Sequence, residues 1–368
     1  MIKKQEALRI TLLVHSRIAI FEWGKSVIDL FTAQAIKNKY TLTLVYDAEE
    51  ITAPDTPVVI IGVDSEWLHL TLDKLNPQRN KIILIHGIAH KDYEYVSHIS
   101  ADQRVTVQKS LNLLKEKKRT RTAFFGVQKN DSSDITKALA FSECFPSEDV
   151  YHVENSVEEC FERLHKELDR YDSIICSNDV MAIYLIARFR ALGINVPERL
   201  YLIGNGNLWL SSHVTPTLTT VSYNPEVTAR LALQMCENLH DFENIGSINM
   251  SVSAQLIERG STEKAIGYQS FDSQASHKRG AYIEYGSEAV YRELSEIVSL
   301  DRVLSTCSED QLYVLRSWIA GDSVECIAEK MFISPDTVKY HLKNLYKLLD
   351  IHSKNELTEL ANNYGLTL

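Results

Sequence analysis

The sequence predicts an α/β domain built on parallel sheets, followed by a small all-α domain. From about residue 8 to 220, short apolar runs alternate with longer amphipathic stretches, and this rhythm stops after Thr262. Strands that alternate with helices in this way are typical of parallel sheets covered on both faces. The last 64 or so residues instead place apolar side chains at helical spacing. A chain of 368 residues also exceeds one ordinary core, so two or three domains are expected.

Seven apolar runs are expected to be buried strands, and amphipathic helices are expected between most of them, for example at 27–37 and 179–192. The expected strands are residues 9–14, 41–46, 58–63, 81–86, 122–127, 173–177 and 200–204.

Composition excludes several classes of protein. The net charge of −10 argues against a general nucleic-acid coat, so any DNA binding must use a small local basic surface. The six cysteines form no CxxC pair and lack histidines at zinc spacing, which indicates a reducing compartment, no disulfide framework and no metal site. No apolar stretch approaches the roughly 20 residues of a membrane span. We therefore expect a cytoplasmic protein with no membrane partner and no cofactor.

The run from residue 177 to 221 carries a specific pattern. Asn178 and Asp179 can cap a helix that begins just after a strand, and Gly193 suits the position that ends it. Pro197 then lies in the turn before the next strand, and Thr215-Pro216 leads into a final crossing segment. This order resembles the sugar-responsive regulators of the LacI family and their relatives, the type I periplasmic binding proteins. The resemblance covers about residues 8–262 and includes SAQLIERGST at 253–262.

The resemblance implies a two-lobe ligand-sensing domain over residues 1–265, with the ligand between the lobes at the carboxyl ends of the strands. Asn178 matches the family's ligand-contacting asparagine, and Lys137 stands where the family usually has a ligand-binding arginine. The other candidates follow expected strand ends. The full set of expected ligand-binding residues is His15, Arg17, His86, Lys137, Asn178, Asn205 and Asn207.

The chain also departs from the family pattern. Gly206 and Asn207 replace the paired acids that hold sugar hydroxyls, while the cations Arg17 and Lys137 are present. This change favours an anionic or phosphorylated effector over a neutral sugar. The expected effector is therefore a sugar-like or anionic small molecule.

Residues 266–302 are expected to form a linker and a connecting helix. The stretch 267–280 is rich in Ser, Gln and Gly, which is typical of a connector. An apolar stripe then predicts a helix at about 287–302 that joins the two domains rigidly.

Residues 303–368 predict four short helices. Ser308 with Gln311, and Ser353 with Glu356, form capping boxes before the first and the last helix. Ser323 starts the second helix, and Ser334 followed by Pro335 starts the third. The tight turn at Phe332-Ile333 between the second and third helices indicates a helix-turn-helix. The stretch 321–357 resembles the DNA-binding domain of the LuxR/FixJ family, although the family's opening Leu-Thr-x-Arg-Glu is weaker here.

By this resemblance the third helix enters the major groove of DNA. Lys339, Lys343 and Lys347 form one stripe on it. The family pattern directs Lys339, Tyr340 and Lys343 to base edges, and Thr337, Asn344 and Lys347 to phosphate or sugar. The expected DNA-binding residues are Ser334, Thr337, Lys339, Tyr340, Lys343, Asn344 and Lys347.

Charge arithmetic predicts a homodimer. From Ser305 to the end, six Lys and Arg residues stand against nine Asp and Glu residues, a net of −3. A single domain should therefore bind DNA weakly, and pairing on a two-fold operator would restore affinity. The last helix, at 354–364, is where such family members often pair.

The predicted function is a ligand-responsive bacterial transcription regulator. A transport binding protein would carry a cleavable signal and would lack a DNA-reading domain. The sequence predicts the opposite of both, so this class is not favoured. An enzyme is not expected, because the chain lacks GxSxG, GxxxxGK[ST], HExxH and a glycine-rich dinucleotide fingerprint. The alternative that remains open is a sugar-like-ligand sensor that acts through a protein partner rather than DNA.

Overall fold

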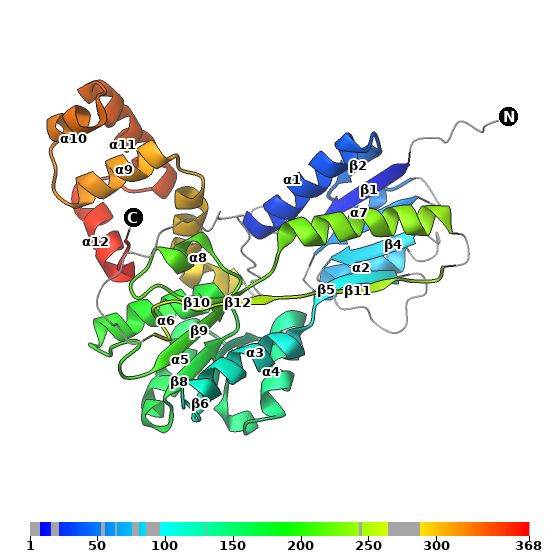
Figure 1. The fold of residues 1–368 in the computed structure, drawn as a ribbon, viewed down its shortest axis with the longest axis horizontal. Helices are drawn as coiled ribbons and strands as arrows, with labels where there is room; N and C mark the ends of the chain where they lie inside the picture. The colour runs from blue at the N-terminus through cyan, green and yellow to red at the C-terminus, as the bar shows by residue number, and fades with distance from the viewer. Residues whose placement is uncertain are drawn as a thin grey trace.

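The computed structural model describes residues 8–15, 22–52, 56–62, 65–75, 81–85, 96–129, 131–242, 245–263 and 288–367. They form two α/β lobes and a helical domain (Figure 1). Within these residues, no helix is both long and apolar enough to cross a membrane.

Lobe 1 is built on a six-stranded sheet of order β11-β5-β4-β3-β1-β2, in which every adjacent pair is parallel. Its strands are β1 (Arg9–Val14), β2 (Thr41–Val45), β3 (Pro57–Ile61), β4 (Lys81–Ile85), β5 (Val96–Ala101) and β11 (Asn249–Val252). Helices α1 (Glu22–Lys37) and α7 (Pro225–Asp241) cover one face of this sheet, and α2 (Ser65–Leu75) covers the other.

Lobe 2 repeats the arrangement in a second six-stranded sheet, of order β12-β10-β9-β8-β6-β7. Its strands are β6 (Thr122–Gln128), β7 (Val150–Val153), β8 (Ser173–Cys176), β9 (Tyr201–Asn205), β10 (Thr219–Ser222) and β12 (Gln255–Ile257). Helices α3 (Gln103–Glu116) and α4 (Ser132–Ser142) pack on one face, and α5 (Val157–Lys166) and α6 (Asp179–Ala191) on the other.

The expected strands are confirmed to within two residues at each end, as are parallel sheets covered on both faces. Three strands, β5, β7 and β11, were not predicted, because short runs such as VYHV and NMSV mix polar and apolar residues. One edge strand differs from the all-parallel expectation, since β12 pairs antiparallel with β10.

The helical domain contains the four expected helices: α9 (Glu309–Ile319), α10 (Val324–Met331), α11 (Pro335–Leu349) and α12 (Lys354–Tyr364). Ser308, Ser323, Ser334 and Ser353 cap them as the sequence predicts, and Ser308 forms its capping box with Gln311. The box predicted for Ser353 differs, because Glu356 accepts from the amide of His352, one residue before the cap. The connecting helix α8 (Glu288–Ser305) precedes them.

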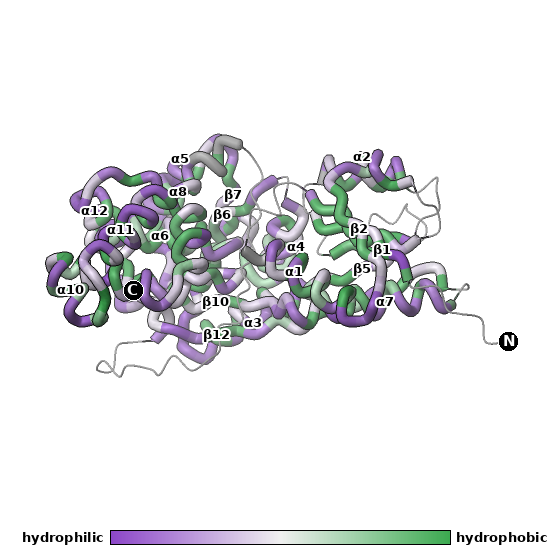
Figure 2. The backbone as a smooth tube through the Cα atoms, turned by 90° about the horizontal axis from the view of Figure 1, so that it is seen from above, coloured by the Kyte–Doolittle hydropathy of each residue, from purple (hydrophilic) through white to green (hydrophobic). Residues whose placement is uncertain are grey.

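This domain does not swing freely from lobe 2. A continuous cluster of buried apolar side chains joins α5 and α6 of lobe 2, helix α8 and the cores of α9, α11 and α12. Figure 2 shows apolar residues along the strands and inner helix faces, with hydrophilic residues outside. Polar contacts reinforce the junction, because Tyr364 donates to Glu296 Oε1 at 2.6 Å and the Thr367 amide donates to the His213 carbonyl at 2.8 Å. Lobe 2, α8 and the helical domain therefore share one core.

Candidate functional site

The carboxyl ends of the parallel strands in both lobes face the junction between the lobes. The chain leaves lobe 1 directly after β5 ends at Ala101, and it leaves lobe 2 directly after β10 ends at Ser222. Because β1 to β5 are mutually parallel, as are β6 to β10, the other strands point their carboxyl ends the same way. Residues that follow these strands therefore lie where a ligand between the lobes would be held.

Lys137 is fully buried on α4, with 2% of its side chain exposed, and its charge is matched within the fold. Its Nζ lies 3.0 Å from Oδ1 of Asp134, one turn earlier, and donates to the Ser177 carbonyl at 2.6 Å. Although burial opposes the charged form, the neighbouring carboxylates raise the pKa of Lys137 above its ordinary value. The lysine lies at the expected end of lobe 2, but it brings no uncompensated positive charge.

Asp134 is the acidic partner, and it sits in a crowded setting. Burial and the nearby carboxylate of Asp131 raise the pKa of Asp134 to about 7, while the Lys137 ammonium opposes that change. Asp131 caps α4 by accepting from the Asp134 amide at 2.8 Å. The protonation of Asp134 is therefore sensitive to pH near neutrality.

The three expected asparagines have different roles in the fold. Asn178 caps α6, with its Oδ1 accepting from the Met181 amide at 3.0 Å. Asn207, in the left-handed region with φ of 56°, accepts from Arg259 Nη2 at 2.7 Å. Asn205 donates to the Cys176 carbonyl at 2.8 Å, and its buried Oδ1 has no hydrogen-bond partner among the described residues. Of these three side chains, Asn205 thus offers a ligand the acceptor that the fold leaves unused.

On lobe 1, His15 follows β1 as expected, and its ring lies against Trp67 with centroids 4.7 Å apart. Trp67 lies in the first turn of α2 and packs on Gly62, where a Cβ would come within 2.3 Å of the indole. The sequence analysis did not single out Trp67, because only the fold brings it beside His15. Arg17 and His86 lie outside the described residues.

Two serines at the start of α4 also escaped the sequence analysis. The hydroxyls of Ser132 and Ser133 are buried without a hydrogen-bond partner in the described structure, and both precede Lys137 on the same helix. Unsatisfied buried polar atoms are rare in folded proteins. The signal was present as Asp131-Ser132-Ser133, separated from the end of β6 by two residues, a helix start near the carboxyl end of a strand. Like Asn205 Oδ1, these hydroxyls belong to residues at the carboxyl ends of the lobe 2 strands, the end that faces lobe 1.

Asp179 forms a polar network of its own. Its buried carboxylate accepts from Ser211 Oγ at 2.5 Å, Thr220 Oγ1 at 2.6 Å and the Leu208 amide at 2.9 Å. Burial raises the pKa of Asp179, although these donors and the charge of Arg259 oppose the shift. Ser211 belongs to η6 (Trp209–Ser212), which therefore depends on Asp179 for its position.

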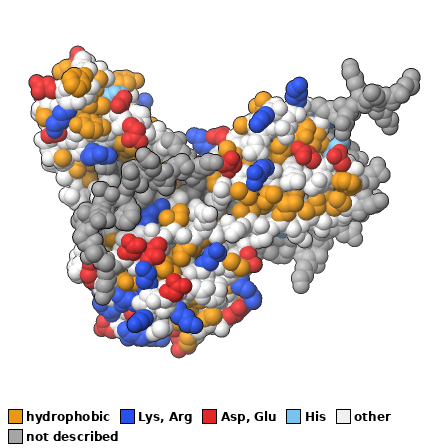
Figure 3. Space-filling model, viewed as in Figure 1, with side chains coloured by type: hydrophobic (Ala, Val, Ile, Leu, Met, Phe, Trp, Pro, Cys, Tyr) orange, Lys and Arg blue, Asp and Glu red, His pale blue; other side chains and the backbone are white. Residues whose placement is uncertain are grey.

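In the helical domain, α10 and α11 meet at a tight turn in which Phe332 has φ of 56° and is 96% exposed. Val338, Leu342 and Leu345 anchor α11 by its buried face. The opposite face is exposed, and it carries Lys339, Tyr340, Lys343 and Lys347. Figure 3 shows this domain projecting from the rest of the molecule. The expected basic stripe is thus accessible.

The remaining expected DNA contacts lie around this face. Ser334 Oγ and Thr337 Oγ1 lie 2.8 Å apart at the start of α11, and Asn344 is half-buried on it. Lys339 Nζ lies 3.6 Å from Asp336 Oδ1, a surface pair that DNA phosphates can replace. These assignments to DNA contacts stay predictions.

Helix α12 is placed differently from the expectation of a free pairing helix. Its apolar residues Leu357, Leu360 and Ala361 are buried, and α12 packs on α6 of lobe 2. Pairing of two chains through this face would first require α12 to leave lobe 2.

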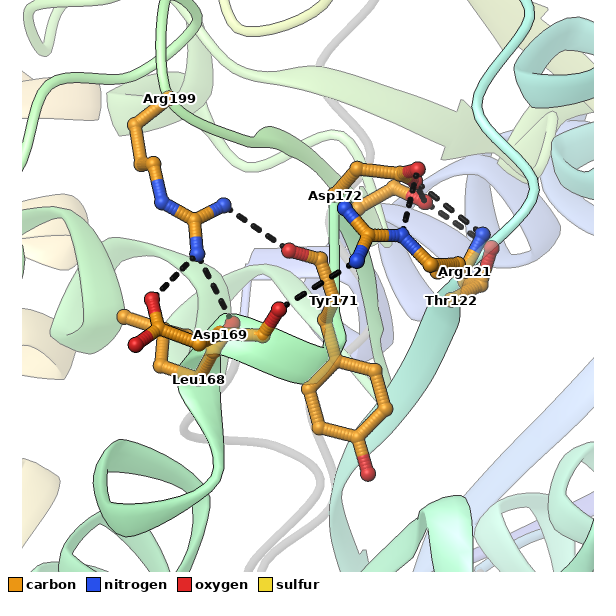
Figure 4. Close-up of polar contacts among 8 residues, drawn as sticks. Arg121, Thr122, Leu168, Asp169, Tyr171, Asp172 and Arg199 are labelled. Carbon is orange, nitrogen blue, oxygen red and sulfur yellow. Dashed lines mark hydrogen bonds and ion pairs between the residues drawn. The ribbon is translucent and has the colours of Figure 1, made fainter.

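Two side chains of the basic run at 115–121 pair with carboxylates of lobe 2, Lys117 with Glu258 and Arg121 with Asp172. Arg121 donates to Asp172 Oδ2 at 3.4 Å and to the Asp169 carbonyl at 3.4 Å (Figure 4). Arg199, in the same view, binds Asp169 Oδ1 at 3.0 Å and the Tyr171 carbonyl at 2.9 Å. Acidic and basic side chains therefore alternate at this end of lobe 2, as Figure 3 also shows.

Comparison with solved structures supports the two-lobe fold. The transcription regulator CcpA of Lactococcus lactis superposes with a TM-score of 0.58 at 16% identity, over 70% of this chain and all of that chain. The regulator CelR in complex with cellobiose gives a TM-score of 0.57 at 14% identity, over 69% of this chain and 84% of that one. At these identities the similarity concerns the fold.

Curated relatives match over shorter stretches. The HTH-type transcriptional repressor PurR of Vibrio vulnificus is 29% identical over 97 residues, 26% of this chain and 29% of that protein. The repressor CytR of Escherichia coli K12 is 31% identical over 90 residues, 24% of this chain and 26% of that protein. The chain thus spans less than a third of the length of these relatives.

Two family models match the chain at separate places. Residues 111–262 match the periplasmic binding protein-like domain, and residues 305–361 match the luxR family of bacterial regulatory proteins. The first range covers most of lobe 2 and its crossing segments, and the second covers the four short helices. The chain therefore combines a periplasmic binding protein-like domain with a C-terminal helix-turn-helix domain of the luxR family.

Proposed function

We propose that this protein is a ligand-responsive bacterial transcription regulator, in which a small molecule bound between the lobes alters operator binding by α11. The exposed basic face of α11, held on a buried apolar face within a luxR-type domain, is the observation that carries this proposal. The carboxyl ends of two facing sheets supply the sensing site.

The effector that fits best is an uncharged, sugar-like molecule. Lys137 was the described cation expected to attract an anion, and Asp134 already neutralises it at 3.0 Å. The unused polar atoms of Ser132, Ser133 and Asn205 suit hydroxyl or amide groups of a ligand. Two structural relatives are described with cellobiose and with ribose bound, which agrees with this chemistry.

The working unit is a homodimer on a two-fold operator. The net charge of −3 from Ser305 onward limits the phosphates that one domain can neutralise. Because the apolar face of α12 is packed against lobe 2, the contact between the two chains uses surfaces other than that face in the resting state. Effector binding then shifts the population between open and closed lobe arrangements, driven by its different affinity for the two.

Capture of genomic fragments by the purified full chain, followed by sequencing, tests the proposal. We expect discrete sites with two-fold symmetry, lost in the Lys339→Ala/Lys343→Ala variant. Equal recovery by both proteins, or no enriched site with wild type in the presence or absence of sugars, would overturn the assignment of α11 as a DNA reader. The chain would then act as a sensor through a protein partner.

A further inference from the structure

Two buried carboxylates from different elements, Asp179 of α6 and Asp301 of α8, accept hydrogen bonds from η6 and from the residue before it. Asp179 accepts from the amide of Leu208 and the hydroxyl of Ser211, at 2.9 and 2.5 Å. Asp301, on α8, accepts from the amide of Leu210 at 2.8 Å. The stretch from Leu208 to Ser211 thus donates hydrogen bonds to one carboxylate of the sensing lobe and to one carboxylate of the helix that leads to the DNA-binding domain.

On the sensing side, the carboxylate of Asp179 lies one step from two candidate ligand residues. Asn178 is its neighbour in the chain, and it caps the same helix, α6. Thr220 Oγ1 donates to Asp179 Oδ1 at 2.6 Å and accepts from the Asn207 amide at 3.2 Å. Gly204 gives the carboxylate its space, because a Cβ there would lie 2.2 Å from Asp179 Oδ1. A ligand that moves Asn178 therefore moves the adjoining Asp179, and one that moves Asn207 changes the hydrogen bond of Thr220 to Asp179.

On the DNA side, Asp301 belongs to a helix that packs against the base of α11. Leu300 and Leu304 of α8 lie in one buried cluster with Leu345 of α11. Glu293 of α8 also accepts from the Val157 amide of lobe 2 at 2.6 Å. Since packed interiors do not deform freely, a shift of α8 carries α11 with it.

We propose that η6 and Asp301 couple the sensing site to the DNA-binding helix α11, with Asp301 as the positioning residue that ties α8 to η6. This inference rests on the proposed function and names the route by which the same site is regulated. A buried amide that loses its acceptor is costly, so η6 cannot move with Asp179 unless α8 follows or the Leu210 contact breaks.

Indole N–H signals in NMR of the full chain can test the coupling without a known effector. The chain has four tryptophans, and two of them report on the two ends of the route. Trp209 lies in η6 itself, and Trp318, whose Nε1 donates to Tyr346 Oη at 2.9 Å, lies in the helical domain. Ser211→Ala removes the contact with Asp179. Ser212→Ala removes a hydroxyl of the same segment that, among the described residues, contacts the Trp209 carbonyl and the His213 ring.

The Ser211→Ala variant is expected to shift the Trp318 indole signal, while Ser212→Ala leaves it at its wild-type position. With Asp301→Ala as background, Ser211→Ala should still move the Trp209 signal but no longer the Trp318 signal. Asp301→Asn keeps an acceptor for Leu210 and should preserve the coupling, which separates loss of the contact from loss of the fold. The proposal is overturned if Ser211→Ala leaves the Trp318 indole signal unshifted. It is also overturned if Ser211→Ala shifts that signal equally in the wild-type and Asp301→Ala backgrounds.

Affinity for a DNA duplex of random sequence at low salt, measured by fluorescence anisotropy, gives the functional readout. Ser211→Ala should change this affinity about fivefold or more, in the range of ordinary coupling between sites, and Ser212→Ala should not. If neither wild type nor any variant binds DNA, but Ser211→Ala still shifts the Trp318 indole signal, the proposed function fails and the coupling stands. Normal DNA binding that is insensitive to Ser211→Ala contradicts the coupling alone.

Discussion

The ammonium of Lys137 lies 3.0 Å from the carboxylate of Asp134, and both side chains are 98% buried. Lys137, expected as a ligand-binding cation, is therefore already engaged in a buried ion pair within lobe 2. Removing one member of a buried ion pair leaves the other unpaired in a medium of low polarity, which is strongly unfavourable.

At pH 8, above the pKa of about 7 at which Asp134 ionises, Lys137→Met should therefore lower the free energy of unfolding by about 3 kcal/mol or more. The double variant Lys137→Met/Asp134→Asn removes both charges and should recover part of that loss. Urea unfolding monitored by circular dichroism measures both. A double variant less stable than Lys137→Met would show that the pair is not the reason for the loss.

The pH dependence of stability should carry a signature of Asp134. Burial raises its pKa to about 7, so the folded state holds a proton that the unfolded chain releases near pH 4. Its contribution to stability is therefore fully present below the unfolded pKa and declines as pH rises toward 7.

Asp134→Asn should flatten this part of the curve. Urea unfolding of wild type and variant between pH 4 and 8 measures the difference between the two proteins. An Asp134→Asn curve parallel to wild type across that range would show that Asp134 does not titrate there.

Gly204 is expected to tolerate no side chain. A Cβ at this position of β9 would lie 2.2 Å from Asp179 Oδ1 and 2.9 Å from Leu218 Cδ2, so Gly204→Ala forces a buried carboxylate out of its network. We expect a loss of about 1–3 kcal/mol in the free energy of unfolding. Gly246→Ala is the matched control, since a Cβ there meets nothing within 4 Å. Equal effects of the two substitutions would contradict the packing around Asp179.

Lobe 2 and the helical domain should lose stability together, because they share one core. Leu345 of α11 is fully buried in the cluster that reaches α6 and α8. Leu345→Ala should cost about 2–5 kcal/mol, and amide hydrogen exchange should rise in α6 as well as in α11. Leu348→Ala, at an exposed position on the same helix, is the control and should change little. Faster exchange confined to α9–α12 would show that the helical domain unfolds by itself.

The sequence predicted the features that depend on local pattern. Apolar runs located most strands, and serines at 308, 323, 334 and 353 located the starts of all four short helices, because a cap depends on residues within one turn. Brief strands of mixed polarity such as β7 gave no such signal.

Contacts between residues that are far apart in the chain could not be predicted from the local sequence pattern. The sequence places Lys137 at the sensing end of lobe 2 but does not show that its ammonium pairs with Asp134, because that contact gains its weight from the burial of both side chains. The role of Lys137 in ligand binding stays a prediction. Trp67 contacts His15 although 51 residues separate them in the chain. Helix α12 packs on α6, more than 160 residues earlier. These contacts come from packing of distant segments, which residue spacing does not encode.

The central claim is that α11 reads DNA through its exposed lysine stripe, and affinity for one captured genomic fragment tests it most directly. Fluorescence anisotropy would compare wild type, Lys339→Ala/Lys343→Ala, and the control Lys330→Ala, which alters a lysine on α10 that pairs with Asp322 at 2.6 Å. We predict a loss of about tenfold or more for the double variant and near wild-type affinity for the control. Equal affinities for wild type and the double variant would contradict the account.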